Sequence, residues 1–193
     1  MRIIPALVLI GVLSFFPSLQ AQTTPAAEIF GGYSFVSFDA GDPSGETDRL
    51  SMHGFGGSVT GNANSWFGIE AEVGGNWVGD CGGFTGVDCS HMDFLVGPRF
   101  AFRGPRAVGF VHNLFGVDHA SVGASVLGAS ASVTDNTLAI ALGGGADVRA
   151  NDILSVRIFQ FDYITTDHFS GLGSNRQHNF RFQTGLVVTL GRR

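Results

Sequence analysis

The sequence has 193 residues, of which 44% are hydrophobic and only 14% are charged, with a formal net charge of −5. Lysine is absent and the arginines form no basic run, so the composition gives no support to nucleic-acid binding. The 29 glycines and 18 phenylalanines, without apolar stripes of helical period, favour an all-β protein with one domain.

The first 21 residues have the pattern of a secretory signal peptide. Arg2 precedes a short apolar run over 3–16, and Ala21 supplies the small residue before a cleavage site. The run is too short for a convincing spanning helix, and no later window reaches the roughly 18 unbroken apolar residues that such a helix requires. The sequence therefore predicts a signal peptide at 1–21 and a single β domain at 22–193, with an uncleaved anchor as the alternative.

Eight later segments alternate between apolar and polar residues and are bounded by turn residues, as strands are. They cover 28–38, 50–61, 66–78, 91–103, 107–118, 136–149, 153–165 and 177–190. Most exceed the usual strand length of about five or six residues and approach the 9–11 residues with which a tilted strand crosses a bilayer. Length alone therefore favours strands of a membrane barrel.

The connections between these segments are sorted by length. The second, fourth and sixth are short, at 62–65, 104–106 and 150–152, whereas the others are longer, at 39–49, 79–90, 119–135 and 166–176. In an up-and-down meander alternate connections lie at the same end, so all the long loops lie at one end. This is typical of outer-membrane barrels, with short periplasmic turns and longer external loops. A soluble lipocalin-like barrel, whose apolar face would point inward, is the alternative.

The faces of the last two segments show the same two-sided pattern. In the segment 177–190, Phe180 and Phe182 alternate with Arg181 and Gln183, so one face is apolar and the other polar. The segment 153–165 loses its alternation near Ile158, and a one-residue β-bulge at positions 158–159 would restore it. In a membrane barrel the apolar face contacts lipid and the polar face lines the lumen.

Charged residues fall on the polar face of several strands. Eight strands enclose a lumen just wide enough for side chains, so charges there must be paired. Two interpretations remain open: a narrow gated ion path, and a structural plug that holds the barrel rigid, which we favour. The predicted lumenal charge network consists of Glu70, Glu72, Arg99, Asp147, Arg149, Arg157, Asp162 and Arg181.

The two cysteines, Cys81 and Cys89, lie in a Gly-rich segment of an exported chain. An oxidising compartment favours a disulfide between them. Two free thiols are the alternative, and a metal site is a poorer one because only His91 is close in sequence. We expect no metal and no cofactor.

Catalytic motifs are scarce in this sequence. His119 and Ser121 share a face if the strand continues, and a His-x-Ser pair of this kind serves an outer-membrane lipid A deacylase, but so short a motif is common by chance. His112 lies in mid-strand and can face the lumen. The other histidines near strand ends are expected to be solvated, namely His53, His91, His168 and His178.

Three motifs resemble the small outer-membrane β-barrel family that includes the OmpA transmembrane domain, OmpX and the opacity-type surface antigens. They are Glu-Ile-Phe-Gly-Gly-Tyr-Ser at 28–34, Gly-Gly-Gly-Ala-Asp at 143–147 and Arg-Ile-Phe-Gln-Phe-Asp-Tyr at 157–163. The final segment is similar to the assembly signal of such barrels, although the chain ends Gly-Arg-Arg and not on an aromatic residue. The positions that carry this signal are Gln183, Gly185, Val188 and Leu190.

The resemblance implies an eight-stranded antiparallel up-and-down transmembrane β-barrel in the bacterial outer membrane. Its expected partners are outer-membrane lipid and the barrel-assembly machinery, with a monomeric state and an unidentified partner for the external loops. We interpret the protein as a non-enzymatic barrel with a structural or surface-exposed role. A small pore or transport accessory, and a deacylase-like enzyme, are the alternatives.

Overall fold

The computed structural model describes residues 24–39, 49–81, 85–126, 129–166 and 177–192, and the predicted signal peptide at 1–21 lies outside them. Within these residues the chain forms eight strands. Their bounds are β1 Pro25–Asp39, β2 Arg49–Asn62, β3 Phe67–Val78, β4 Val87–Arg103, β5 Ala107–Val126, β6 Ala129–Arg149, β7 Leu154–Thr166 and β8 Gln177–Arg192.

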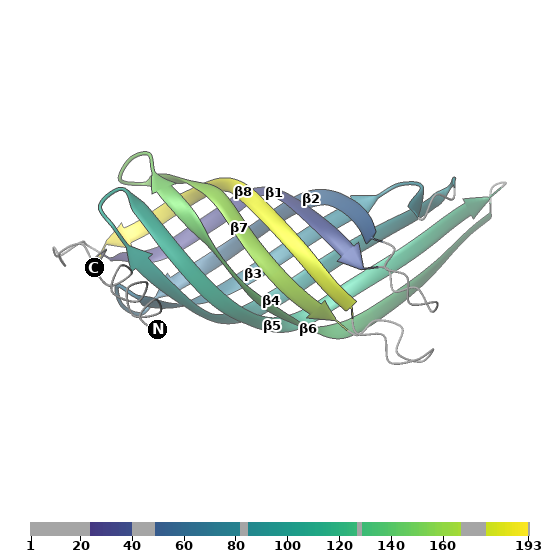
Figure 1. Ribbon diagram of the computed structural model, residues 1–193, viewed down its shortest axis with the longest axis horizontal. Coiled ribbons are helices and arrows are strands. Elements are labelled where there is room, and N and C mark those ends of the chain that lie inside the picture. The colour runs from purple at the N-terminus through teal and green to yellow at the C-terminus, as the bar shows by residue number, and fades with distance from the viewer. Residues whose placement is uncertain (1–23, 40–48, 82–84, 127–128, 167–176, 193) are drawn as a thin grey trace, which may run out of the picture.

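The strands close into one antiparallel barrel in sequence order (Figure 1). Each strand pairs with the next, and β8 pairs with β1 to close the ring, with Tyr33 opposite Thr184. The predicted fold class, an eight-stranded up-and-down barrel, is confirmed. Among the described residues, no helix is long and apolar enough to cross a membrane.

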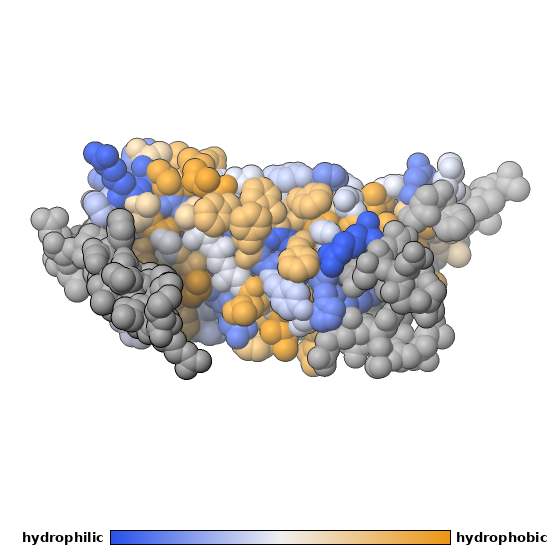
Figure 2. Space-filling model, in the orientation of Figure 1, coloured by the Kyte–Doolittle hydropathy of each residue, from blue (hydrophilic) through white to orange (hydrophobic). Residues whose placement is uncertain are grey.

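The outer wall of the barrel is apolar and the lumen is polar. On β3, Ile69 is 48% exposed whereas the neighbouring Glu70 is fully buried, the reverse of a soluble protein. This inversion is the pattern of a barrel that faces lipid. Apolar side chains cover much of the wall in Figure 2. They include Phe55, Trp77, Phe94, Val96, Phe115, Leu142, Phe161, Phe180 and Leu186.

The two ends of the barrel differ. The N-terminal end of β1 and the C-terminal end of β8 lie at the end of the short turns, on the left in Figure 1. There the side-chain oxygens of Asn64 and Asn151 each accept two backbone N–H hydrogen bonds from the following residues, at 2.8–2.9 Å. Asparagine at this position stabilises a tight turn through its own side chain. The short turns are therefore locally encoded.

The long connection predicted at 119–135 is not a loop. β5 and β6 continue as a paired hairpin, with Val122 opposite Val133, and only 127–128 fall between the two strands. The prediction was wrong because Ala, Ser and Gly have low strand propensity, whereas pairing with a neighbouring strand decides the outcome here. The hairpin reaches beyond the other strands on the right in Figure 1.

The predicted bulge in β7 is present. The register of β7 against β8 shifts between Arg157 and Gln160, and the register against β6 shifts at the same place. Ile158 and Phe159 are both exposed, at 51% and 39%, while Arg157 and Gln160 are fully buried. The extra residue therefore returns Gln160 to the lumen, which is the one-residue correction that a bulge provides.

Candidate functional site

Arg181 of β8 lies at the centre of the lumen and contacts three carboxylates from three other strands. Its Nη1 lies 2.6 Å from an oxygen of Asp93 and its Nε donates to Asp162 at 2.9 Å, while Nη2 pairs with Glu72. All four side chains are buried. A guanidinium presents its donors in a planar fork, so one arginine can hold β3, β4, β7 and β8 together.

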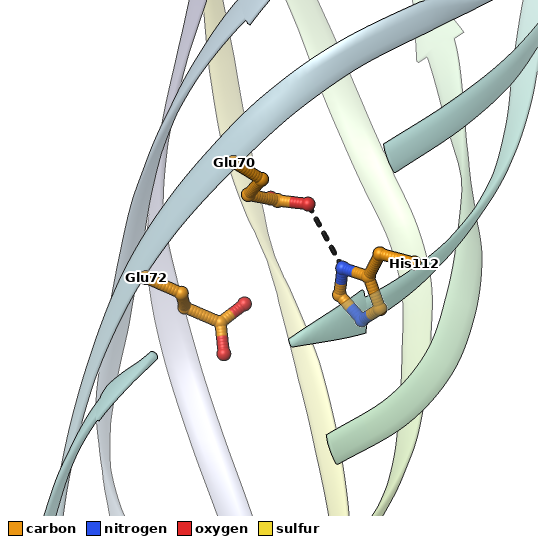
Figure 3. Close-up of side chains that lie close together, drawn as sticks. All are labelled: Glu70, Glu72 and His112. Atoms are coloured by element: carbon orange, nitrogen blue, oxygen red, sulfur yellow. Dashed lines mark hydrogen bonds and ion pairs between the residues drawn. The ribbon is translucent and has the colours of Figure 1, made fainter. Parts of the chain in front are cut away.

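His112 of β5 bridges Asp162 and a fourth carboxylate, that of Glu70. Its Nδ1 lies 2.8 Å from Glu70, as Figure 3 shows, and its Nε2 lies 2.9 Å from Asp162. Because an ionised carboxylate only accepts hydrogen bonds, an imidazolium, with a proton on each ring nitrogen, satisfies both contacts. Asp162 fits here because the facing Gly143 has no Cβ, which would lie 1.9 Å from its Oδ1.

Two further arginines fill the lumen toward the short turns. Arg157 donates to Asp147 at 2.8 Å and lies over the rings of Phe30 and Phe110, with centroids at 4.1 and 4.4 Å. Arg99 donates to Thr60 at 2.9 Å and also stacks on Phe110, at 3.9 Å. Cation–π contacts strengthen when the cation is desolvated, as both are here. These buried side chains therefore lie packed together in the lumen between the Arg181 cluster and the short turns.

Each end of the lumen carries a further cluster. At the short-turn end, Arg103 donates to both oxygens of Glu28, at 2.9 and 3.0 Å. At the opposite end, buried His91 pairs with buried Asp118 below an apolar cluster that includes Phe38. The expectation that His91 is solvated was wrong, because its side chain points inward from β4. The lumen is thus occupied at both ends and at its centre.

The structure places seven of the eight predicted network residues in the lumen: Glu70, Glu72, Arg99, Asp147, Arg157, Asp162 and Arg181. Arg149 is the exception and is exposed, donating to the carbonyl of Pro105 in a short turn. Arg149 falls on the same alternate positions of β6 as the lumenal residues, but it is the last residue of the strand, where the chain leaves the barrel. Sequence reasoning missed Glu28, Asp93 and Asp118, although they share the parity of lumenal residues. It placed Arg103 on the polar face, and Gln160 there through the bulge, but included neither in the network.

The cluster of Glu70, Glu72 and His112 has the residue types of a metal site, with ligand atoms within 4.8 Å of one another (Figure 3). Metal binding requires an imidazole nitrogen with a free lone pair. Both nitrogens of His112 already contact carboxylate oxygens, and the two glutamates already accept from Ser58, Gln160 and Arg181. The donor set therefore fits a hydrogen-bonded network better than a metal ion.

Cys81 and Cys89 form a disulfide, as predicted, with a Cα–Cα distance of 5.7 Å. The alternatives of free thiols and of a metal site with His91 are both wrong. The two cysteines are buried and join the apolar cluster of Val36, Phe38 and Met52 at the long-loop end. The bond ties the end of β3 to the start of β4 at the rim.

His119 and Ser121 both lie on the outer face of β5, as the His-x-Ser interpretation requires. The Nδ1 of His119 lies 2.7 Å from the amide oxygen of Asn136 on β6. An amide carries no charge with which to stabilise an imidazolium, in contrast to the carboxylate of a catalytic triad. Among the described contacts, His119 is therefore paired with a neutral amide and not with a carboxylate.

The residues of the predicted assembly signal divide between the two faces of β8. Gln183 is fully buried in the lumen, and Gly185 packs its Cα face against the backbone of β1. Val188 and Leu190 are 36% and 45% exposed on the outer wall. Their role in assembly stays a prediction.

An apolar outer wall, a charged and filled lumen, and short turns beside the chain ends define a bacterial outer-membrane β-barrel protein. The model of the family described as outer membrane protein beta-barrel domain matches residues 6–193, so the chain belongs to this family. No curated protein matches the chain.

Solved structures with the same fold include the attachment invasion locus protein Ail of Yersinia pestis, with 16% identity, a TM-score of 0.60, and coverage of 85% of this chain and 99% of Ail. Neisserial surface protein A shares 7% identity with a TM-score of 0.65, over 86% of this chain and 97% of that one. OprG from Pseudomonas aeruginosa shares 14% identity with a TM-score of 0.50, over 89% and 98%. At these identities the likeness concerns the fold.

Proposed function

We propose that this protein is a non-enzymatic, monomeric outer-membrane barrel with a structural or surface-exposed role, and that its lumen does not conduct. The observation that supports the proposal most is the network around Arg181, because three buried carboxylates bind one guanidinium across the full width of the barrel. An ion that passed would have to break these contacts, which would leave buried charges without partners. Any function then belongs to the outer wall and the external end.

Conductance of the folded protein in planar lipid bilayers tests this proposal. We expect no discrete current steps at moderate voltage in wild-type protein. As a positive control, Arg181→Ala combined with Arg157→Ala removes the two side chains that fill the centre, and we expect steps or increased leak if the variant stays folded. Reproducible wild-type steps of uniform size would overturn the proposal and favour the small-pore alternative.

Non-enzymatic character is the second part of the proposal, and the contact between His119 and Asn136 supports it. Mass spectrometry of lipid A from cells with and without expression is the direct assay. We expect identical acyl-chain patterns for wild type and for Ser121→Ala. Loss of one acyl chain in wild type alone would favour the deacylase-like alternative.

The external end is the part of the molecule that can meet other partners. The β5–β6 hairpin carries exposed Val133 and Leu138 beyond the last residues of β7. Ail was crystallised with the heparin analogue sucrose octasulfate. For the present chain, with no lysine and a net charge of −5, we do not propose a polyanionic ligand. Surface proteolysis of intact cells at this hairpin tests its exposure, and resistance there would contradict the assigned orientation.

A further inference from the structure

A hollow of about 260 Å³ lies on the outer wall at the long-loop end, between β3, β4 and β5. Two cross-strand rows form it. In the row nearer the middle of the barrel, Trp77 is opposite Ser90, and Ser90 is opposite Ser121. In the row nearer the long-loop end, Asp88 is opposite Gly123 on β5, with Gly79 on its β3 side. Because side chains alternate along a strand, all of these residues share the outer face.

The chemistry of the hollow differs from that of the wall below it. Trp77 is 54% exposed and packs against Phe55, with ring centroids 5.9 Å apart, so its indole forms the boundary with the apolar band. Ser90 and Ser121 supply hydroxyls that both donate and accept, and exposed Asp88 supplies two acceptor oxygens. The hollow therefore combines one aromatic surface with a few polar groups, and placed polar groups of this kind fix the orientation of a small ligand.

The walls of the hollow are held in place before any ligand arrives. The disulfide between Cys81 and Cys89 closes the β3–β4 connection directly beside Asp88 and Ser90. Asp80, with a φ of 52°, accepts a hydrogen bond from the backbone N–H of Gly86 at 3.0 Å. A site on a rigid support loses less conformational entropy on binding. A covalent bond and a hydrogen bond therefore constrain the described part of this rim next to Asp88 and Ser90.

We propose that this hollow binds the sugar ring of a neutral glycolipid headgroup in the outer leaflet. The C–H face of a hexose would lie on the indole of Trp77, and its hydroxyls would bond to Ser90, Ser121 and Asp88. The volume suits one ring, since sites for drug-sized ligands occupy roughly 300–1,000 Å³. The apolar band begins directly below, so the acyl chains of the lipid would lie along the wall. The carboxylate of Asp88 disfavours phosphorylated or acidic sugars by like-charge repulsion.

Tryptophan fluorescence tests the proposal, because the chain has only two tryptophans. Trp66→Phe leaves Trp77 as the sole reporter. The full chain is folded into nanodiscs of phosphatidylethanolamine and phosphatidylglycerol, with or without monogalactosyl diacylglycerol. We expect a saturable spectral change of Trp77 with the galactolipid and none without it. A spectrum independent of the galactolipid overturns the proposal.

Two substitutions separate the hollow from the membrane surface in general. We expect Trp77→Ala to weaken galactolipid binding at least tenfold, while Trp66→Ala changes it less than twofold, since Trp66 is similarly exposed at 56% but lies at the opposite end. Ser121→Leu fills the hollow, keeps Trp77 and should also abolish binding. Heat-modifiable mobility on a detergent gel verifies that each variant is folded. Equal binding by Trp77→Ala and Trp66→Ala would refute the site.

Two further experiments distinguish a lipid-linked sugar from a free one, and a neutral sugar from an acidic one. Free methyl galactoside added to detergent-solubilised protein should bind at least tenfold more weakly than the galactolipid, because it lacks acyl chains. Equal affinity would contradict a lipid-linked ligand. We expect Asp88→Asn to admit a glucuronosyl diacylglycerol that wild-type protein excludes, and exclusion by both proteins would contradict the role of Asp88.

Discussion

The lumen and the outer rim contain similar polar groups, but those of the lumen bind one another and those of the rim are exposed. In the lumen each carboxylate of the central cluster already contacts a guanidinium, an imidazolium or an amide, as Asp162 does with Arg181 and His112. At the rim, Asp88 and Ser90 lie exposed around a hollow. A polar group can bind a ligand only with hydrogen-bonding capacity that the fold does not already use, so the rim is the better candidate for binding.

Removing the central cation should give the largest effect. We expect Arg181→Met to lower the free energy of unfolding by about 3–5 kcal/mol, because Glu72, Asp93 and Asp162 would lose their common partner while remaining buried. Urea unfolding in lipid vesicles, followed by fluorescence, measures the change. Arg149→Met is the matched control and should cost less than about 0.5 kcal/mol, since Arg149 is exposed. Similar losses in both variants would contradict the special role of the lumen.

A charge on the outer wall tests where the bilayer lies. Val96 and Val133 are both exposed, at 52% and 61%, but only Val96 lies on the outer wall of the barrel body, whereas Val133 has lumenal parity in the part of the hairpin that extends beyond the other strands. We expect Val96→Arg to cost about 2–4 kcal/mol, as arginine does at depth on a lipid-facing wall, and Val133→Arg only about 0–1 kcal/mol, because Val133 lies beyond the barrel body. The measurement is the free energy of unfolding of each variant in vesicles whose bilayer thickness matches the apolar wall of the barrel. An equal cost at both positions would place the hairpin inside the membrane.

Removing the disulfide should affect the rim more than the lumen. The cysteines are eight residues apart, so by loop-closure entropy Cys81→Ala with Cys89→Ala costs at most about 2–3 kcal/mol. We expect this variant to bind galactolipid more weakly while the barrel keeps its heat-modifiable mobility. Undiminished binding would show that the hollow does not depend on the disulfide.

Much of the architecture could be predicted from the sequence because a strand has a period of two. The alternation of Phe180 and Phe182 with Arg181 and Gln183 assigns both faces of β8 correctly, and the broken rhythm at Ile158 reveals the bulge. Sorted connections then assign both ends of the barrel. The alternation is a local signal that each strand carries by itself, whereas the sorting of the connections is read from the whole chain.

The errors came from features that depend on neighbouring strands. Arg149 has lumenal parity but ends β6 outside the closed part of the barrel, and His91 is buried although it lies near a strand end. The depth of a residue depends on how far adjacent strands are staggered, which no single strand encodes. The hairpin at Val122 and Val133 likewise depends on cross-strand pairing.

The protonation of His112 tests the central claim, a closed lumenal network, most directly. Nitrogen NMR of the folded protein in nanodiscs at neutral pH, with the signal assigned by loss in His112→Gln, reports both ring nitrogens. The account predicts an imidazolium with two N–H protons that exchange with heavy water over hours, because Glu70 and Asp162 hold them in a sealed core. A neutral ring, or ring protons that exchange within seconds, would contradict it.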